Sequence, residues 1–182
     1  MPRPIFLTGM MGSGKTTIGR LLARDLGAEF IDHDERIERL FGRSIPELFA
    51  EGEPHFRRCE RRALETLVRE PAFGSRPVVV ATGGGLVVDP ANRATMASCG
   101  IVVHLDVPLE ELLVRLDSPQ ARAVRPLVAD AQALRERLSA LLSARNPVYR
   151  TAEYCIDGRG SPAEVVGRLR RQLFDDPEPQ AV

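Results

Sequence analysis

This 182-residue sequence has one lysine, three cysteines, a formal net charge of zero and no long apolar stretch. Its formal net charge of zero argues against broad binding to nucleic acid or to an acidic membrane surface. No apolar run approaches the roughly 18–20 residues that cross a bilayer. The cysteines, Cys59, Cys99 and Cys155, lack the spacing of metal ligands, so we interpret them as small buried side chains in a reducing compartment.

The length and composition are those of one globular domain with a core of its own. Hydrophobic residues make up 43% of the chain and charged residues 27%, which is typical of a soluble protein. An apolar segment begins at Ile5, which leaves no room for a signal peptide, so we expect a cytoplasmic location and a monomer. We expect a single domain over residues 1–174 and a disordered tail, rich in proline and glutamate, over 175–182.

The strongest pattern is the stretch GMMGSGKT, from Gly9 to Thr16, which fits the phosphate-binding P-loop G-x-x-x-x-G-K-[ST]. An apolar run precedes it and a helical pattern follows, as this loop requires. Its glycines let backbone N–H groups turn toward phosphates. Lys15, the only lysine among 25 basic residues, can reach the β- and γ-phosphates, and the Thr16 hydroxyl can ligate Mg²⁺. The motif predicts a nucleoside triphosphate site, because a chance glycine-rich turn would not bring lysine, threonine, strand and helix together.

Short apolar runs alternate with helical patterns along the rest of the chain. Strands are expected at 5–7, 29–31, 78–81, 101–105 and 154–156, and helices at 18–26, 35–40, 46–50, 54–69, 90–98, 108–116, from 134 to near Pro147, and 165–173. This order predicts an α/β fold with a central parallel sheet of about five strands between helices. Residues 117–131 lack clear periodicity and are interpreted as a mobile lid over the active site.

Two polar or glycine-rich groups follow expected strands, where open α/β sheets place their ligands. Asp32 and Asp34 follow the second strand, and the turn Gly83–Gly85 follows the third. The two carboxylates could hold a metal and a substrate, or could simply be turn and helix-capping residues. The glycines could bring backbone close to a ligand, or form only a tight turn.

A P-loop alone leaves a kinase, a GTPase and an ATP-driven machine open. The guanine-reading motif N-K-x-D is absent, since Lys15 is the only lysine, and this weakens the GTPase interpretation strongly. No insertion is large enough for a motor or a second protein-binding domain. A compact phosphotransferase acting on a small molecule remains.

The sequence resembles the shikimate kinase family from about Ile5 to Leu173. Seven blocks carry the resemblance, in the family's order: Gly9–Ala23, Asp32–Asp34, Gly42–Ile45, Phe56–Glu60, Gly83–Gly85, Arg125–Leu127 and Arg145–Tyr149. The resemblance implies a three-layer P-loop kinase fold with a mobile lid, and transfer of the ATP γ-phosphate to the 3-hydroxyl of shikimate with Mg²⁺ as cofactor.

The family's roles can be carried over to matching positions. The resemblance implies catalytic roles for Lys15, Asp34 and Arg125, and Mg²⁺ binding by Thr16 and Asp32. It implies ATP contacts from Gly12, Ser13, Gly14, Lys15, Thr16, Thr17, Arg115 and Arg125, with Arg115 on the adenine and Arg125 in the lid. It implies shikimate contacts from Asp34, Arg57, Gly83, Gly84, Gly85 and Arg145. It also implies that the substrate-binding helices cover about residues 33–61. A planar guanidinium suits the carboxylate of shikimate, which the resemblance assigns to Arg57 and Arg145.

Simpler interpretations stand beside these roles. Arg57 alone would more often belong to a solvated helix face, and Arg125 could be only a loop residue. The histidines at 33, 55 and 104 receive no chemistry, and Phe49 and Phe56 are expected to pack in the core, although they could line the substrate pocket. Two rival functions stay open: a kinase for another small polyol acid such as gluconate, and a catalytically idle regulator that binds ATP or shikimate.

Overall fold

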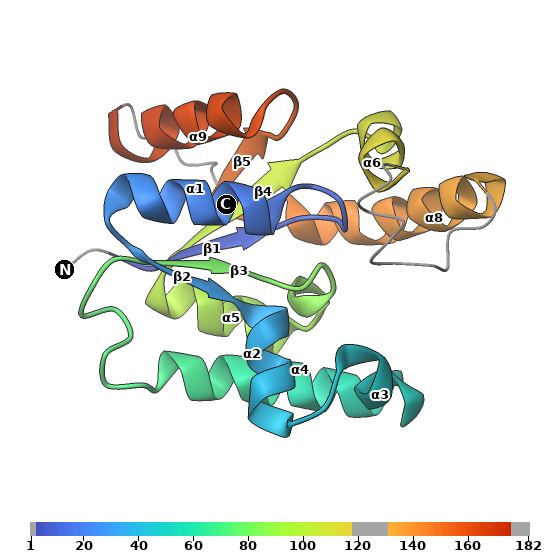
Figure 1. Cartoon of the computed structure of the whole chain (residues 1–182), viewed down its shortest axis with the longest axis horizontal. Helices are drawn as coiled ribbons and strands as arrows, with labels where there is room; N and C mark the ends of the chain where they lie inside the picture. The colour runs from blue at the N-terminus through green and yellow to red at the C-terminus, as the bar shows by residue number, and fades with distance from the viewer. Residues whose placement is uncertain (1–2, 118–130, 176–182) are drawn as a thin grey trace.

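The computed structural model describes residues 3–117 and 131–175, and its centre is a five-stranded parallel sheet (Figure 1). The strand order is β2-β3-β1-β4-β5, and every neighbouring pair is parallel. The strands are β1 (Ile5–Thr8), β2 (Glu29–Asp32), β3 (Val78–Ala81), β4 (Ile101–Asp106) and β5 (Tyr154–Asp157). The predicted fold class is confirmed. Because β1 lies between β3 and β4, its carboxyl end is a switch point in strand order, where such sheets bind ligands.

The sheet is buried on both faces because its side chains alternate between two cores. Ile5 and Leu7 of β1 pack into one apolar cluster, while Phe6 between them packs into the other. The same alternation places Val79 in the first cluster and Val78 and Val80 in the second. Period-two alternation with apolar residues on both faces is the pattern of a central parallel strand.

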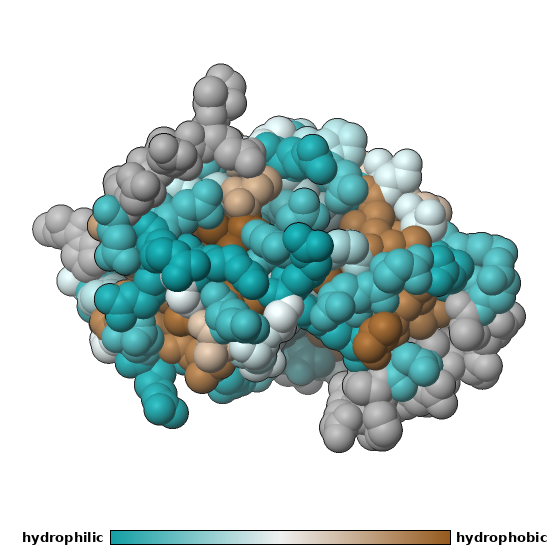
Figure 2. Space-filling view, turned by 90° about the horizontal axis from the view of Figure 1, so that it is seen from above, coloured by the Kyte–Doolittle hydropathy of each residue, from teal (hydrophilic) through white to brown (hydrophobic). Residues whose placement is uncertain are grey.

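Helices cover both faces of the sheet (Figure 1). One face carries α1 (Lys15–Leu26) and α9 (Pro162–Arg170), which continues as the short segment η2 (Arg171–Asp175). The other face carries α4 (Glu53–Val68) and α5 (Pro90–Cys99). Toward the carboxyl ends of the strands lie the turn η1 (Leu86–Val88), α6 (Leu109–Leu116) and α8 (Ala131–Tyr149). Figure 2 looks onto the α1 and α9 side, where hydrophilic residues cover most of the surface and apolar areas are interspersed. These helices are therefore amphipathic, as their spacing predicts.

A smaller corner is built from α2 (His33–Phe41), α3 (Ile45–Ala50) and α4. Its own apolar cluster contains Ile37, Leu48, Phe56, Cys59 and Ala63. The start of α3 is fixed by a capping box, in which Ser44 and Glu47 each accept a hydrogen bond from the other's backbone N–H. This corner holds α2 and α4 beside the carboxyl ends of β2 and β3.

Two expectations, one about a helix boundary and one about a side chain, need correction or refinement. The helix expected to end near Pro147 continues to Tyr149, because a helical bond from the Arg150 N–H to the Asn146 carbonyl spans the proline. Phe49 is not in the core: it is 40% exposed and stacks on the buried Phe56 with ring centroids 4.1 Å apart.

The cysteine prediction holds for one residue and is too strong for two. Cys59 is buried, whereas Cys99 and Cys155 are only partly buried. No helix in the described ranges is both long and apolar enough to span a membrane. The tail from 176 onward, and the expected lid except for Asp117 and Ala131, lie outside the described residues.

Candidate active site

The P-loop joins the end of β1 to the start of α1 and depends on left-handed glycines. Gly9, Gly12 and Gly14 have φ angles of 147°, 81° and 92°, which residues other than glycine rarely adopt. A Cβ at Gly9 would also lie 2.9 Å from the Leu105 carbonyl oxygen. Helix α1 has no side-chain cap and no acidic residue in its first turn. Its positive N-terminal end therefore faces the cleft without a competing negative side chain from its own first turn.

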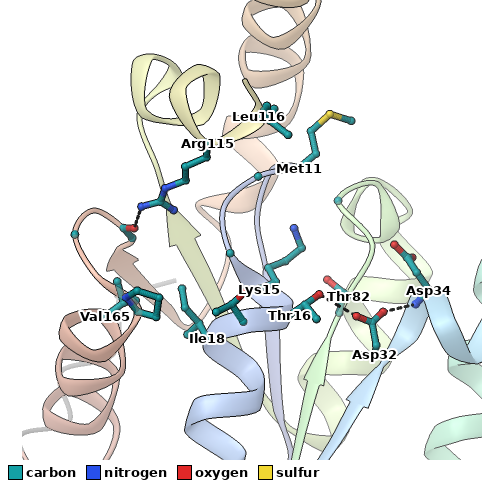
Figure 3. A pocket seen from close by; sticks show the side chains of 17 residues that line it. Met11, Lys15, Thr16, Ile18, Asp32, Asp34, Thr82, Arg115, Leu116 and Val165 are labelled. Atoms are coloured by element: carbon teal, nitrogen blue, oxygen red, sulfur yellow. Dashed lines mark hydrogen bonds between the residues drawn. The ribbon is translucent and has the colours of Figure 1, made fainter. Parts of the chain in front are cut away.

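Lys15 folds back over the loop that carries it. Its Nζ donates to the carbonyl oxygens of Gly9 and Met10 at 2.8 and 2.9 Å, and lies 3.4 Å from Ser13 Oγ. Figure 3 shows the ammonium group pointing into the pocket. These bonds hold the charge over the P-loop, where a phosphate would lie against the backbone N–H groups.

Thr16 and Asp32 form a compact pair of oxygen donors. Thr16 Oγ1 donates to Asp32 Oδ2 at 2.9 Å, while Asp32 Oδ1 caps α2 by accepting from the N–H groups of Asp34 and Glu35. One Asp32 oxygen therefore caps α2, as the simpler interpretation predicts, while the other lies beside the Thr16 hydroxyl. Among the described residues, no group of three or more His, Cys, Asp and Glu could hold a metal. A hydroxyl and a carboxylate fit a hard cation such as Mg²⁺, which completes its shell with waters and phosphate oxygens.

These residues line a cleft of 490 Å³ (Figure 3). The cleft runs from Asp32 and Asp34 at one end, past the P-loop, to the loop after β5 at the other; its walls include Met11, Gly12, Gly14, Lys15, Thr16, Thr17, Ile18, Thr82, Gly84, Arg115, Leu116, Gly158, Gly160, Pro162 and Val165. Ser13, which belongs to the loop itself, is fully buried.

Arg115 connects α6 to the far end of this cleft. Its Nη2 donates to the Gly158 carbonyl at 2.8 Å, its Nη1 to the Ser13 carbonyl at 3.2 Å, and its Nε to Glu111 at 3.1 Å. Both ends of the guanidinium are therefore fixed on backbone, so its flat face is held at the cleft wall (Figure 3).

A second group of polar side chains lies where α4 meets the glycine turn. Arg57 Nη1 donates to Glu60 at 2.8 Å, and its Nη2 and Nε donate to Glu53 at 2.8 and 3.2 Å. The Arg57 guanidinium also lies over the Phe56 ring, 5.3 Å from its centroid. Because a guanidinium has five N–H groups, these three bonds to described residues use one hydrogen on each nitrogen and leave a second hydrogen on each Nη.

Gly83 and Gly85 allow this group to approach the backbone. A Cβ at Gly83 would lie 2.8 Å from an Asp34 oxygen and 3.1 Å from a Glu60 oxygen, and a Cβ at Gly85 would clash with the Arg57 guanidinium. Burial raises the pKa of Glu60, while Arg57 opposes that rise and Asp34 adds to it. Asp34 thus faces both the cleft and the Arg57–Glu60 pair, and links the two.

Arg145 reaches the same turn from α8. Its Nη1 donates to the Gly84 carbonyl at 3.2 Å, and the Tyr149 hydroxyl donates to the same oxygen at 2.5 Å. Arg57, Arg145 and the three glycines are therefore brought together beside the P-loop cleft. Arg125 is the one predicted site residue that lies outside the described residues.

Sequence reasoning missed several residues of this site. Glu60 and Tyr149 stood inside motif blocks but received no role, and the loop from Gly158 to Pro162 was not considered. The signal for that loop is the run Asp157-Gly158-Arg159-Gly160, a glycine-rich turn at the carboxyl end of a strand, like the turn at Gly83.

Two of the histidines are core residues, in agreement with their having no assigned chemistry. His33 and His104 are almost fully buried, and burial lowers the pKa of each to about 4. Both are therefore neutral near pH 7.

The comparisons with known proteins agree over nearly the whole chain. The family model described as shikimate kinase matches residues 11–174. The chain belongs to the shikimate kinase family. It is 41% identical to a shikimate kinase of Aromatoleum aromaticum over 172 residues, which are 93% of each protein.

Solved structures of shikimate kinases superpose on the fold. The enzyme from Acinetobacter baumannii, in complex with shikimate, gives a TM-score of 0.84 at 36% identity, covering 97% of this chain and 96% of that one. The enzyme from Bacteroides thetaiotaomicron gives 0.83 at 35% identity, covering 94% and 98%. Family membership makes the chain an ATP-dependent kinase, so the GTPase and motor alternatives are excluded.

Proposed function

We propose that this protein transfers the γ-phosphate of ATP to the 3-hydroxyl of shikimate, giving shikimate 3-phosphate and ADP. One observation carries the proposal: Asp34 lies in the wall of the P-loop cleft and, at the same time, faces the Arg57–Glu60 pair across Gly83. A carboxylate in that position can contact an acceptor hydroxyl beside the γ-phosphate, while arginines hold an acceptor carboxylate further away.

The P-loop side would bind the nucleotide. Backbone N–H groups from Gly12 to Thr17 and the N-terminal end of α1 would surround the phosphates. Lys15 would turn from its carbonyl partners to the β- and γ-phosphates, and the flat Arg115 guanidinium would stack on the adenine.

Mg²⁺ fits beside these phosphates. Thr16 Oγ1 and Asp32 Oδ2, 2.9 Å apart, would hold it directly or through water. When bound, the ion neutralises charge on the β- and γ-phosphate oxygens.

The acceptor side would bind shikimate by its carboxylate and hydroxyls. Arg57 would offer its two remaining Nη hydrogens as a fork, and Arg145 would add a second cation. Glu53 and Glu60 keep the Arg57 guanidinium in place before the substrate arrives, which lowers the entropy lost on binding. Gly83, Gly84 and Gly85 would let the acceptor lie close to the backbone.

The reaction then needs one proton transfer and one in-line displacement. The acceptor oxygen forms a bond to the γ-phosphorus, the bond from that phosphorus to the β–γ bridging oxygen breaks, and Asp34 accepts the hydroxyl proton. Lys15 would stabilise charge on the transferring group. The family resemblance implies the same role for Arg125, which lies outside the described residues.

The function is tested by following ADP formation from MgATP in a coupled assay, with shikimate and gluconate offered separately. We expect strong stimulation by shikimate and none by gluconate. Stimulation by gluconate alone would keep the phosphoryl transfer and overturn the acceptor. No stimulation by either would favour the idle regulator.

Replacing Arg57 by alanine is expected to raise KM for shikimate roughly ten- to a hundredfold, because a charge-assisted, two-pronged contact is lost and Glu60 is left buried without its partner. KM for ATP should change little. The matched control is Arg58→Ala, since Arg58 is the next residue and its side chain is exposed. Equal effects of the two substitutions on KM for shikimate would count against a specific contact.

A further inference from the structure

Gly84 lies where the P-loop meets the part of the site that contains Arg145 and Tyr149. A Cβ at this position would lie 3.2 Å from the Gly9 carbonyl oxygen and 3.6 Å from the Met11 nitrogen of the P-loop. On its other side it would lie 3.6 Å from the Tyr149 hydroxyl oxygen. The glycine turn is therefore packed between the phosphate-binding backbone and one tyrosine hydroxyl.

Tyr149 and Arg145 share the Gly84 carbonyl. They lie four residues apart on α8, so their side chains leave the same face of the helix. The tyrosine bond is the short one, at 2.5 Å, and the arginine bond is 3.2 Å long. Burial raises the pKa of Tyr149, so its hydroxyl remains a protonated donor near neutral pH.

His104 of β4 fixes the tyrosine ring from behind. The two rings are parallel within 5°, with centroids 4.7 Å apart, and both side chains are almost fully buried. Among the described residues, His104 Nδ1 has no hydrogen-bond partner. His104 pairs with Thr8 in the sheet, directly before the P-loop. The stack thus anchors α8 to the part of the sheet that holds the phosphate site.

We propose that Tyr149 is a positioning residue for the acceptor substrate, an inference that rests on the proposed function: its hydroxyl holds the Gly84 carbonyl and so leaves Arg145 available to the substrate carboxylate. Without the hydroxyl, Arg145 is the described side chain that remains within hydrogen-bonding distance of the Gly84 carbonyl, which is partly buried. The guanidinium is then drawn toward the backbone, because it no longer shares that carbonyl with a second side-chain donor. Substrate must compete with that contact.

The first test compares the two tyrosines of the chain, each changed to phenylalanine. Tyr149→Phe is expected to raise KM for shikimate roughly five- to tenfold, the effect of one lost hydrogen bond, with KM for ATP nearly unchanged. Tyr154→Phe is the matched control, because Tyr154 is also buried, in β5, but packs in the other apolar cluster of the sheet. A merely structural role would lower thermal stability in Tyr149→Phe without separating the two KM values.

The second test measures tyrosine emission when shikimate binds, so it does not require a variant that turns over. The chain has two tyrosines and no tryptophan, so in the Tyr154→Phe protein Tyr149 is the only source of tyrosine emission. Shikimate is expected to change that emission, because Arg145 shifts toward the substrate, and to leave the emission of Tyr154 in Tyr149→Phe unchanged. His104→Phe, which keeps a ring in the stack, should retain normal KM for shikimate, whereas His104→Ala should raise it.

The outcomes separate this inference from the proposed function. If the wild-type protein forms no ADP with shikimate, the function itself is overturned and the inference falls with it. If the wild type is active but Tyr149→Phe shows an unchanged KM for shikimate, or Tyr149 emission does not respond to shikimate, only the role of Tyr149 is overturned. A Tyr149→Phe protein that does not fold leaves the emission measurement to decide.

Discussion

Replacing Lys15 by methionine is expected to lower kcat by roughly a hundred- to a thousandfold, because in the proposed mechanism this cation stabilises charge on the transferring phosphoryl group. KM for ATP should rise as well, since we propose that the same ammonium contacts the phosphates in the ground state. Steady-state kinetics with MgATP and shikimate measure both effects. Methionine keeps most of the length of the side chain, so packing at the P-loop changes little.

A matched control removes a different cation from the same helix. Arg20 is exposed on α1, where it pairs with Glu35 at 3.0 Å. Arg20→Met should leave kcat and both KM values close to those of the wild type, because a surface ion pair contributes little to stability. A similar loss of kcat in both variants would mean that the helix, and not the Lys15 charge, had been disturbed.

The composition offers an independent check on Lys15. Since the chain has one lysine, an amine-acylating reagent can modify a single side chain besides the N-terminal amine. We expect acylation of Lys15 to abolish activity and MgATP to protect it. Full activity after complete modification of Lys15 would refute its catalytic role.

The sequence was sufficient for the parts of this protein that are local in the chain. The P-loop and the strands are each specified by residues within a few positions of one another, and both were confirmed. The order of the strands in the sheet was not predicted, because apolar runs indicate central strands but not which strands are neighbours.

The residues that sequence reasoning missed depend on contacts between distant segments. The bond from Tyr149 to Gly84 spans 65 positions, and that from Arg115 to Gly158 spans 43. Neither a tyrosine nor an arginine indicates, by its residue type alone, which distant segment it will contact. Phe49 shows the opposite error: its apolar character favoured the core, but its ring stacks on Phe56 at the surface, beside Arg57. Tertiary placement decided these cases.

Replacing Asp34 by asparagine is expected to lower kcat by roughly a hundred- to ten-thousandfold, the range in which a general base contributes. Asparagine has nearly the same shape but a much weaker base, so the acceptor hydroxyl keeps a neighbour that cannot take its proton. KM for ATP should change little. Initial rates over a grid of ATP and shikimate concentrations separate these parameters.

The control for Asp34 is its neighbour Glu35, whose exposed carboxylate pairs with Arg20 on the surface. Glu35→Gln makes the same chemical change one residue further along α2 and should leave kcat unchanged.

Binding measurements distinguish the two roles that Asp34 could have. Calorimetric titration of Asp34→Asn with shikimate, in the presence of ADP, reports affinity without turnover. Near-normal affinity with lost turnover would identify Asp34 as the base. Weakened affinity with normal kcat at saturating shikimate would reduce it to a residue that holds the ring hydroxyls. The position of Asp34 favours the first outcome, because it faces the phosphate cleft, while Arg57 and Arg145 can supply the attraction for the substrate carboxylate.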